Sequence, residues 1–169
     1  MARLGKGMFL GLALLALAAC RSETEAQVDA QLSQWLWPEK RLYFQARSRC
    51  TVAVYRLDLP GLRAGVRQAL TPREGLQDLR DGRAVAFVDP ALTPDSISSA
   101  VMGMQLPSGL GLLGVAMTAR DCMDDTVAQG VNRMLTTPGI LTLFDPAERV
   151  LVLVDWQTRR AVFMRDRRR

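Results

Sequence analysis

Residues 140–164 read ILTLFDPAERVLVLVDWQTRRAVFM. Three runs rich in apolar and β-branched residues, ILTLF, RVLVLVDW and RAVFM, are separated by turn residues at 145–147 and at 157–158. Runs of this length between turn signals are typical of strands joined by hairpins, so we predict a three-stranded antiparallel meander. The middle run is almost entirely apolar. We therefore expect it to be the central strand, covered by helices.

Two further strands and a helix are expected before the meander. The segments 49–57 (RCTVAVYRL) and 83–89 (RAVAFVD) are dense in β-branched and apolar residues, which indicates strands. Between them, Thr71 is followed by Pro72 and Glu74. This pattern predicts a helix that begins with a threonine cap, a proline in the first position and a glutamate that completes a capping box.

Residues 96–119 contain no charged side chain. Their length alone would allow a membrane-spanning helix, but a proline, several hydroxyl residues and four glycines disfavour one. We expect two buried helices that break near 107–108. Gly109, Gly111 and Gly114 also match the pattern G-x-G-x-x-G. Because a dinucleotide-binding loop should directly follow a strand, we interpret them as packing glycines.

Three aspartates, Asp121, Asp124 and Asp125, precede an amphipathic stretch at 126–135. Three carboxylates could hold a divalent cation, although their spacing is not that of a calcium loop. Acidic residues are also favoured at a helix N-terminus by the helix dipole. We prefer this second interpretation and predict no metal site.

Together these elements predict an α+β fold. We expect an antiparallel sheet of about five strands that includes the C-terminal meander, with helices from residues 72–136 packed on one face. Residues 35–169 are enough to bury a core and are expected to form a single domain. We recognise no family resemblance in this region.

The first 20 residues, MARLGKGMFLGLALLALAAC, have the pattern of an export signal. Two basic residues precede an apolar run of about a dozen residues, which is too short for a permanent membrane span. The run ends in LAAC at 17–20, which resembles the lipobox of bacterial lipoprotein signal peptides. The resemblance implies that the Cys20 thiol receives a diacylglyceryl group, that residues 1–19 are removed, and that the new amino terminus is also acylated.

The same resemblance implies a membrane location. Two or three acyl chains, such as palmitate, on the residue at 20 would make detachment rare, so the lipid bilayer is an expected partner. An ordinary secretory signal with a coincidental cysteine is the alternative. In some bacterial lipoproteins an aspartate after the lipidated cysteine retains the protein in the inner membrane. Arg21 therefore indicates the outer membrane, with the domain in the periplasm. Residues 20–34 are then a lipidated N-terminus and a tether or loosely held helix.

Two cysteines remain, Cys50 and Cys122. The chain has no histidine, which excludes the usual zinc ligand sets and a cysteine–histidine catalytic pair. In an oxidising periplasm, an otherwise unassigned pair of cysteines is expected to form a disulfide. We predict a structural Cys50–Cys122 bond that joins the 49–57 strand to the helices of the middle region.

Positive charge is concentrated at the C-terminus, in Arg165, Arg167, Arg168 and Arg169. Such a tail could bind anionic lipid headgroups, lipopolysaccharide phosphates or acidic wall polymers. A solvated tail without a function is an equal alternative. We expect no nucleic-acid partner.

The shortage of catalytic patterns favours a non-enzymatic function. We expect a membrane-anchored envelope lipoprotein that acts as an interaction or assembly module, with another envelope protein or an anionic polymer as its partner. One alternative is a cell-wall polysaccharide hydrolase that pairs Glu39 or Glu74 with an aspartate. Another is a lipoprotein that binds a small ligand or anion through the arginines. None of these requires a cofactor.

Overall fold

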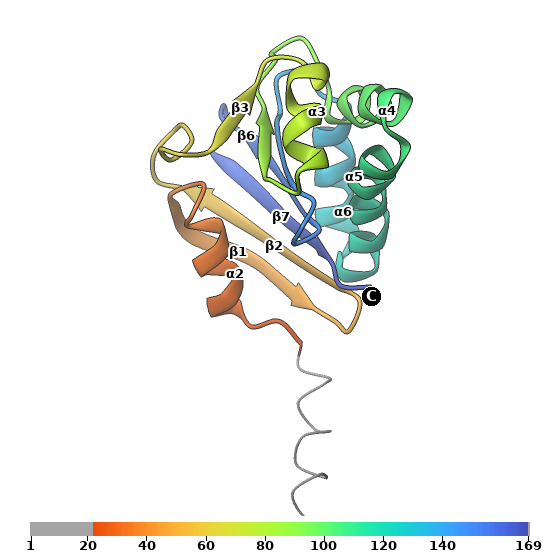
Figure 1. Ribbon diagram of the computed structural model, residues 1–169. Coiled ribbons are helices and arrows are strands. Elements are labelled where there is room, and N and C mark those ends of the chain that lie inside the picture. The colour runs from red at the N-terminus through yellow and green to blue at the C-terminus, as the bar shows by residue number, and fades with distance from the viewer. Residues whose placement is uncertain (1–21, 169) are drawn as a thin grey trace, which may run out of the picture.

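Strand β6 (Val150–Asp155) lies at the centre of a seven-stranded sheet in the computed structural model, which describes residues 22–168 (Figure 1). The strand order across the sheet is β1 (Pro38–Ala46), β2 (Cys50–Leu57), β7 (Arg160–Asp166), β6, β5 (Leu141–Asp145), β4 (Val85–Phe87) and β3 (Arg67–Ala69). The central position of β6 is the one expected from its apolar sequence.

The predicted C-terminal meander is confirmed, because β5, β6 and β7 pair antiparallel in sequence order. Aspartate side chains hold its two turns. The Asp145 carboxylate accepts a hydrogen bond from the backbone N–H of Glu148 (3.1 Å), and Asp155 accepts one from Gln157 (2.9 Å). Aspartates commonly stabilise turns in this way, by accepting from backbone N–H groups that have no partner in the sheet.

The α+β class is confirmed, but the expected antiparallel sheet of about five strands is corrected. The sheet has seven strands, and β3 pairs parallel with β4. These two strands are connected by helix α3 (Pro72–Arg80), as a parallel pair requires a crossover. Strand β1 was not expected, since it begins at a proline and carries Glu39, Lys40 and Arg41 on an edge of the sheet.

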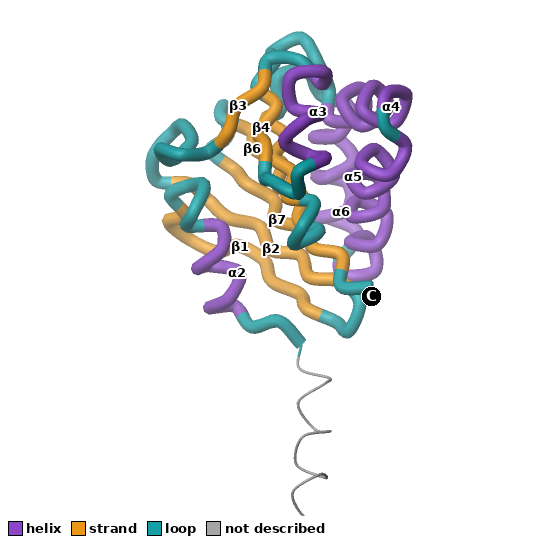
Figure 2. Tube along the Cα trace, in the orientation of Figure 1, coloured by secondary structure: helices purple, strands orange, loops and turns teal. Residues whose placement is uncertain are grey.

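Helices cover both faces of the sheet, whereas the sequence led us to expect helices on one face (Figure 2). One face packs against α3, α4 (Pro94–Met104), α5 (Leu106–Ala119), the 3-10 turn η1 (Arg120–Cys122) and α6 (Asp125–Thr136). The other face packs against α2 (Glu25–Leu32). The break between α4 and α5 falls at Gln105, close to the expected position.

Helix α2 lies in the stretch that we expected to be a tether or loosely held helix. Its Val28 and Leu32 side chains are fully buried against the sheet. The Asp29 carboxylate accepts hydrogen bonds from Arg41 on β1 (2.9 Å) and from the Tyr55 hydroxyl on β2 (2.6 Å). The packed part of the chain therefore begins before residue 35.

Close packing between α4 and α5 depends on Gly109. A Cβ atom at this position would lie 2.3 Å from the Cα atom of Met102, so no larger residue fits without moving the helices apart. Gly109, Gly111 and Gly114 all lie within α5, and none follows a strand. The interpretation as packing glycines is confirmed for Gly109 and for Gly111, where a Cβ would lie 3.2 Å from the Phe144 ring, but a Cβ at Gly114 would make only an ordinary contact of 3.8 Å with Arg168. Among residues 22–168, no helix has both the length and the apolar character needed to cross a membrane.

The predicted disulfide is present between Cys50, at the start of β2, and Cys122 in η1. It closes a loop with a sequence separation of 72 residues. A second link lies beside it, because the Tyr43 hydroxyl donates to the Cys122 carbonyl (3.0 Å) and accepts from the Asp124 N–H (3.2 Å). These contacts fix the junction of α5 and α6 to the β1–β2 hairpin.

We expect Gly109→Ala to lower the free energy of unfolding by about 1–3 kcal/mol, because the added methyl group collides with the α4 backbone. Gly130→Ala in α6 is the matched control, since a Cβ there has no atom within 4 Å. It should raise the stability by about 0.4–1 kcal/mol through the loss of unfolded-state entropy. Urea unfolding of the two variants measures both effects. Equal stability of the variants would contradict this account of the α4–α5 contact.

Reducing the Cys50–Cys122 bond should lower the free energy of unfolding by about 4 kcal/mol, as the chain-entropy model gives for a loop of this length. Urea unfolding with and without dithiothreitol provides the comparison. The double variant Cys50→Ala/Cys122→Ala is the control, because its midpoint should not respond to the reductant. A wild-type midpoint that is also insensitive would show that the bond contributes little.

Candidate functional site

The C-terminal arginines meet the rest of the domain at the end of β7. Arg165 lies in β7, and Arg167 and Arg168 directly follow this strand. Arg169 lies outside the described residues, as do the signal segment 1–19, the predicted lipid-attachment residue Cys20 and Arg21. The described arginines contact the rest of the domain, although the Arg168 side chain remains about half exposed.

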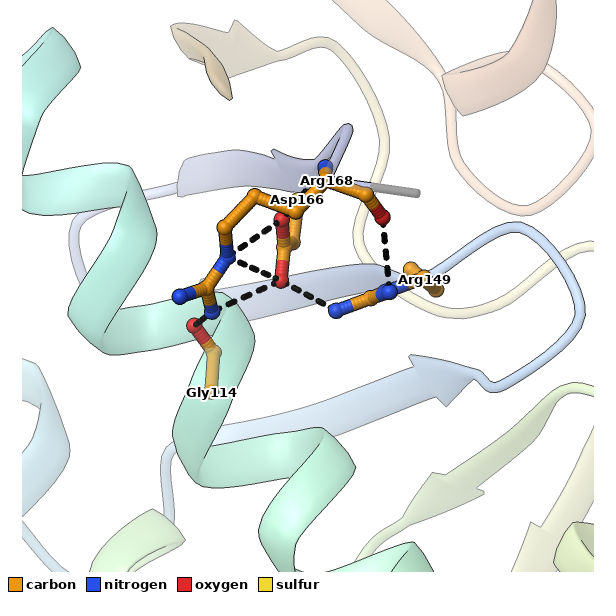
Figure 3. Close-up of polar contacts among 4 residues, drawn as sticks. All are labelled: Gly114, Arg149, Asp166 and Arg168. Atoms are coloured by element: carbon orange, nitrogen blue, oxygen red, sulfur yellow. Dashed lines mark hydrogen bonds and ion pairs between the residues drawn. The ribbon is translucent and has the colours of Figure 1, made fainter. Parts of the chain in front are cut away.

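A buried carboxylate organises this end of the molecule (Figure 3). The Asp166 side chain is fully buried, and its oxygens accept hydrogen bonds from the Arg168 guanidinium (Nε 3.1 Å, Nη2 3.0 Å). The Arg149 guanidinium, from the β5–β6 turn, forms an ion pair with the same carboxylate and donates to the Arg168 carbonyl (2.8 Å). Arg168 also reaches the Gly114 carbonyl on α5 (3.4 Å). Asp166 thus connects a turn, a helix and the end of the chain.

The charge state of Asp166 follows from these contacts. Burial acts to raise the pKa of this carboxyl group, but the hydrogen bonds from Arg168 and the positive charges of Arg168 and Arg149 outweigh it. The net result is a pKa below the ordinary value, so Asp166 stays ionised at neutral pH. Its negative charge offsets part of the local positive charge.

Arg165 points toward the other side of the sheet, where α2 lies. Only 13% of its side chain is exposed, and it forms ion pairs with Glu23 and with Glu148 (3.5 Å). It also donates to the Gln31 side chain of α2 and lies over the Phe163 ring, 5.5 Å from the ring centre. Burial and repulsion from Arg167 lower its pKa. Arg165 therefore fastens α2 to β7 and has little surface left for an external anion.

A polar hollow of about 780 Å³ lies beside these contacts. Two buried atoms in its wall, Oε2 of Glu23 and Nε of Arg165, have no hydrogen-bond partner in the described part of the chain. The remaining lining is polar and comes from Ser22, Thr24, Gln27, Gln31 and Arg167. Ser22, which lines this hollow, is only two residues after Cys20 in the sequence. The arginine-rich end of the sheet is therefore close along the chain to the predicted site of lipid attachment.

Helix α5 carries a row of exposed apolar side chains, here called the α5 ridge. It consists of Leu106, Leu110, Leu113 and Met117, which are 57%, 49%, 39% and 66% exposed. Their 4-3-4 spacing places them on one face of the helix, opposite the buried Leu112 and Val115. We expected the helices of 96–119 to be buried and did not predict this ridge, although the spacing of its residues was a signal for it.

The other predicted candidates lie elsewhere. Glu39 is on β1 and Glu74 is on α3 next to β3, so they belong to opposite edges of the sheet. The Arg56 guanidinium, which donates to Glu39 (2.7 Å), lowers the pKa of this carboxyl group, whereas a general acid needs a raised pKa. The Glu74 carboxylate accepts from the Leu70 backbone N–H (2.8 Å).

Two of the three aspartates near Cys122 have the structural role that we preferred, whereas Asp121 lies in η1, ahead of the helix. Asp124 caps α6 by accepting from the Val127 backbone N–H (2.8 Å), and Asp125 lies in the first turn of this helix. Within residues 22–168, no group of three or more acidic or cysteine side chains could hold a metal ion.

No protein-family model, curated protein or solved structure matches the chain. The candidate site is therefore defined from the structure alone, by two features. One is the arginine-rich end of the sheet around Asp166 and Arg165, and the other is the α5 ridge. The Arg168–Gly114 contact joins them.

We expect Asp166→Asn to lower the free energy of unfolding by about 1–3 kcal/mol at pH 7, because it weakens hydrogen bonds from two charged arginines. The native pKa of Asp166 is depressed, so its stabilising contribution is present above the unfolded value of about 4 and is lost as the pH falls through the native value. The gap between variant and wild type should therefore narrow below about pH 4. Urea unfolding as a function of pH measures it.

Asp58→Asn is the control for this series, since Asp58 is exposed and accepts from Arg159 through its backbone carbonyl, which the substitution retains. It should change the stability by less than about 0.5 kcal/mol at any pH. A gap between Asp166→Asn and wild type that stays constant from pH 7 to pH 3 would contradict the assignment of a depressed pKa to Asp166.

Proposed function

We propose that this protein is an envelope lipoprotein, anchored by acyl chains on Cys20, whose exported domain acts as a non-enzymatic interaction module at the membrane surface. Arg21 favours the outer membrane, with the domain facing the periplasm. The observation that carries the proposal is the short distance along the chain between the lipobox and the packed domain. Helix α2 begins at Glu25, five residues after Cys20.

A short connection has a physical consequence for an anchored domain. The residues between 20 and 25 extend at most about 3.5 Å each, so the domain would stay close to the lipid headgroups. The arginine-rich end of the sheet, where Glu23 contacts Arg165, is the part nearest to the anchor along the chain. This end would then face the membrane or any partner held there.

The disulfide supports export. Disulfides form and persist in oxidising compartments such as the periplasm and are rare in the cytosol. The Cys50–Cys122 bond is internal and structural, and both residues are buried. Export through a lipoprotein signal and the use of a structural disulfide are therefore mutually consistent.

The alternatives have less support. A polysaccharide hydrolase needs two carboxyl groups that face each other across the scissile bond, and Glu39 and Glu74 lie at opposite edges of the sheet. Binding of a small anion by the C-terminal arginines competes with internal ion pairs, because Arg165 and Arg168 already contact Glu23 and Asp166. An extended surface partner suits the exposed groups better than a small ligand.

Mass spectrometry of the full chain expressed in bacteria tests the anchor. We expect a mature protein without residues 1–19, with acyl chains on Cys20, that partitions into the detergent phase of Triton X-114 and fractionates with the outer membrane. Cys20→Ser should be neither acylated nor cut before residue 20, because serine lacks the thiol that forms the thioether. Cys50→Ala/Cys122→Ala is the control and should still be acylated. An unmodified residue 20 in the wild type would refute the proposal.

A further inference from the structure

We propose that the α5 ridge and the arginines around it form a second membrane contact, which docks the domain on the anionic phospholipid headgroups of the leaflet that holds the anchor. This inference rests on the proposed lipid anchor and adds to it an orientation for the domain.

The ridge has the character of a surface that enters the headgroup region. Leu106, Leu110, Leu113 and Met117 extend over about 16 Å of helix at 1.5 Å per residue. Helix α5 itself carries no charged residue, so the ridge can approach lipid without desolvating an ionised group on its own helix. The largest apolar patch on a soluble domain typically covers about 300–600 Å² and often marks a contact surface.

Arginines surround this ridge. Arg149 lines a hollow beside Leu110, Arg120 lines one beside Leu113 and Met117, and Arg49 and Arg168 line one on the other side of Met117. Two aspartates, Asp95 and Asp121, also line these hollows, and Asp166 is buried beneath Arg149 and Arg168. Because Asp166 pairs with Arg149 and Arg168, the four guanidinium groups exceed the three carboxylates by one charge, and the exposed Arg49 and Arg120 are the groups available to a lipid phosphate. Leucines flanked by arginines are typical of segments that lie in a membrane interface and attract anionic lipids.

The ridge is continuous with the end of the domain that adjoins the anchor. Ser22 and Arg167 line the same polar hollow, and the Arg167 backbone N–H donates to the Arg49 carbonyl (2.8 Å). The next residue, Arg168, contacts Gly114 in the middle of α5. In Figure 1 the C-terminus accordingly lies beside the layer that contains α5 and α6. One short segment thus connects the anchor side of the sheet to the ridge.

The available area favours a membrane over a second copy of the chain. Stable protein–protein contacts bury about 800 Å² on each partner, and four side chains that are about half exposed supply roughly half of this. A second copy would also bring a second set of arginines to the contact. An anchored domain needs much less, because the acyl chains provide the affinity and the ridge only has to orient the domain.

Spin labelling of the full acylated chain in vesicles tests the docking. With Cys20 acylated and Cys50 bonded to Cys122, a cysteine introduced by Leu110→Cys is the sole free thiol. We expect a label there to be accessible to oxygen and protected from a water-soluble nickel reagent in vesicles of phosphatidylethanolamine and phosphatidylglycerol. Gln157→Cys, in the β6–β7 turn, is the matched control and should behave as a fully aqueous site.

Two double variants test whether the arginines around the ridge are required for docking. Arg49→Gln/Arg120→Gln, or a change to phosphatidylcholine vesicles, should lower the ratio of oxygen to nickel accessibility at position 110 several-fold. Arg73→Gln/Arg80→Gln removes the same charge from exposed positions on α3 and should leave the ratio unchanged. An equal decrease of this accessibility ratio in the two double variants would contradict a role for the arginines around the ridge.

Three other outcomes would overturn the proposal in distinguishable ways. A label at 110 that remains aqueous while the protein floats with the vesicles would refute docking and leave the anchor intact. A label that is protected but shows dipolar broadening, relieved by dilution with unlabelled protein, would assign the ridge to a second copy. A chain that is not acylated and does not float would refute the proposed function itself.

Discussion

Burial of both faces of β6 is the constraint on which the remaining structure depends. Val150, Val152 and Val154 belong to the apolar cluster on one face, and Leu151 and Leu153 belong to the cluster on the other. An apolar strand in this position cannot leave either face to water, so the chain must supply cover on two sides. Helices α3 to α6 provide one cover, and α2 with the segment after it provides the other. The N-terminal helix is therefore part of the core.

This constraint also explains where the charged groups gather. Strands β2, β6 and β7 are filled with apolar residues along their length, so ionised side chains are placed at strand ends, turns and edges. Where a charge must be buried, as at Asp166, arginines from separate elements converge on it. A buried ion pair stabilises the fold only if its hydrogen-bonding groups have partners. The Asp166 carboxylate meets this condition, because it accepts hydrogen bonds from the backbone and the guanidinium of Arg168. The arginines at this end of the sheet therefore stabilise the fold by pairing with Asp166, and they also contribute to the protein surface.

The sequence predicted those features that depend on local chemistry. The turns of the meander and the threonine cap of α3 follow from groups a few residues apart, and they are present. The expected capping box of α3 is not, because the Glu74 carboxylate accepts from the backbone N–H of Leu70 and not from that of Thr71. Strand β1 and helix α2 were not predicted as parts of the core because they depend on distant partners. Asp29 of α2 meets Arg41 and Tyr55 only in the folded chain. The roles of Arg165 and Arg168 were missed for the same reason.

Helix α5 has apolar residues both on the face that packs in the core and on the face that is exposed. Its apolar residues extend around more of the helix than the core can cover, because Gly109 draws α5 onto α4 and directs Leu112 and Val115 inward. The leucines on the opposite face are then exposed. A domain that diffuses freely gains solubility from charges at such positions, and α5 has none. A domain fixed next to a bilayer gains instead from an apolar face, since lipid is present at high local concentration. The ridge therefore fits the proposed lipid anchor, which would hold the domain next to a bilayer.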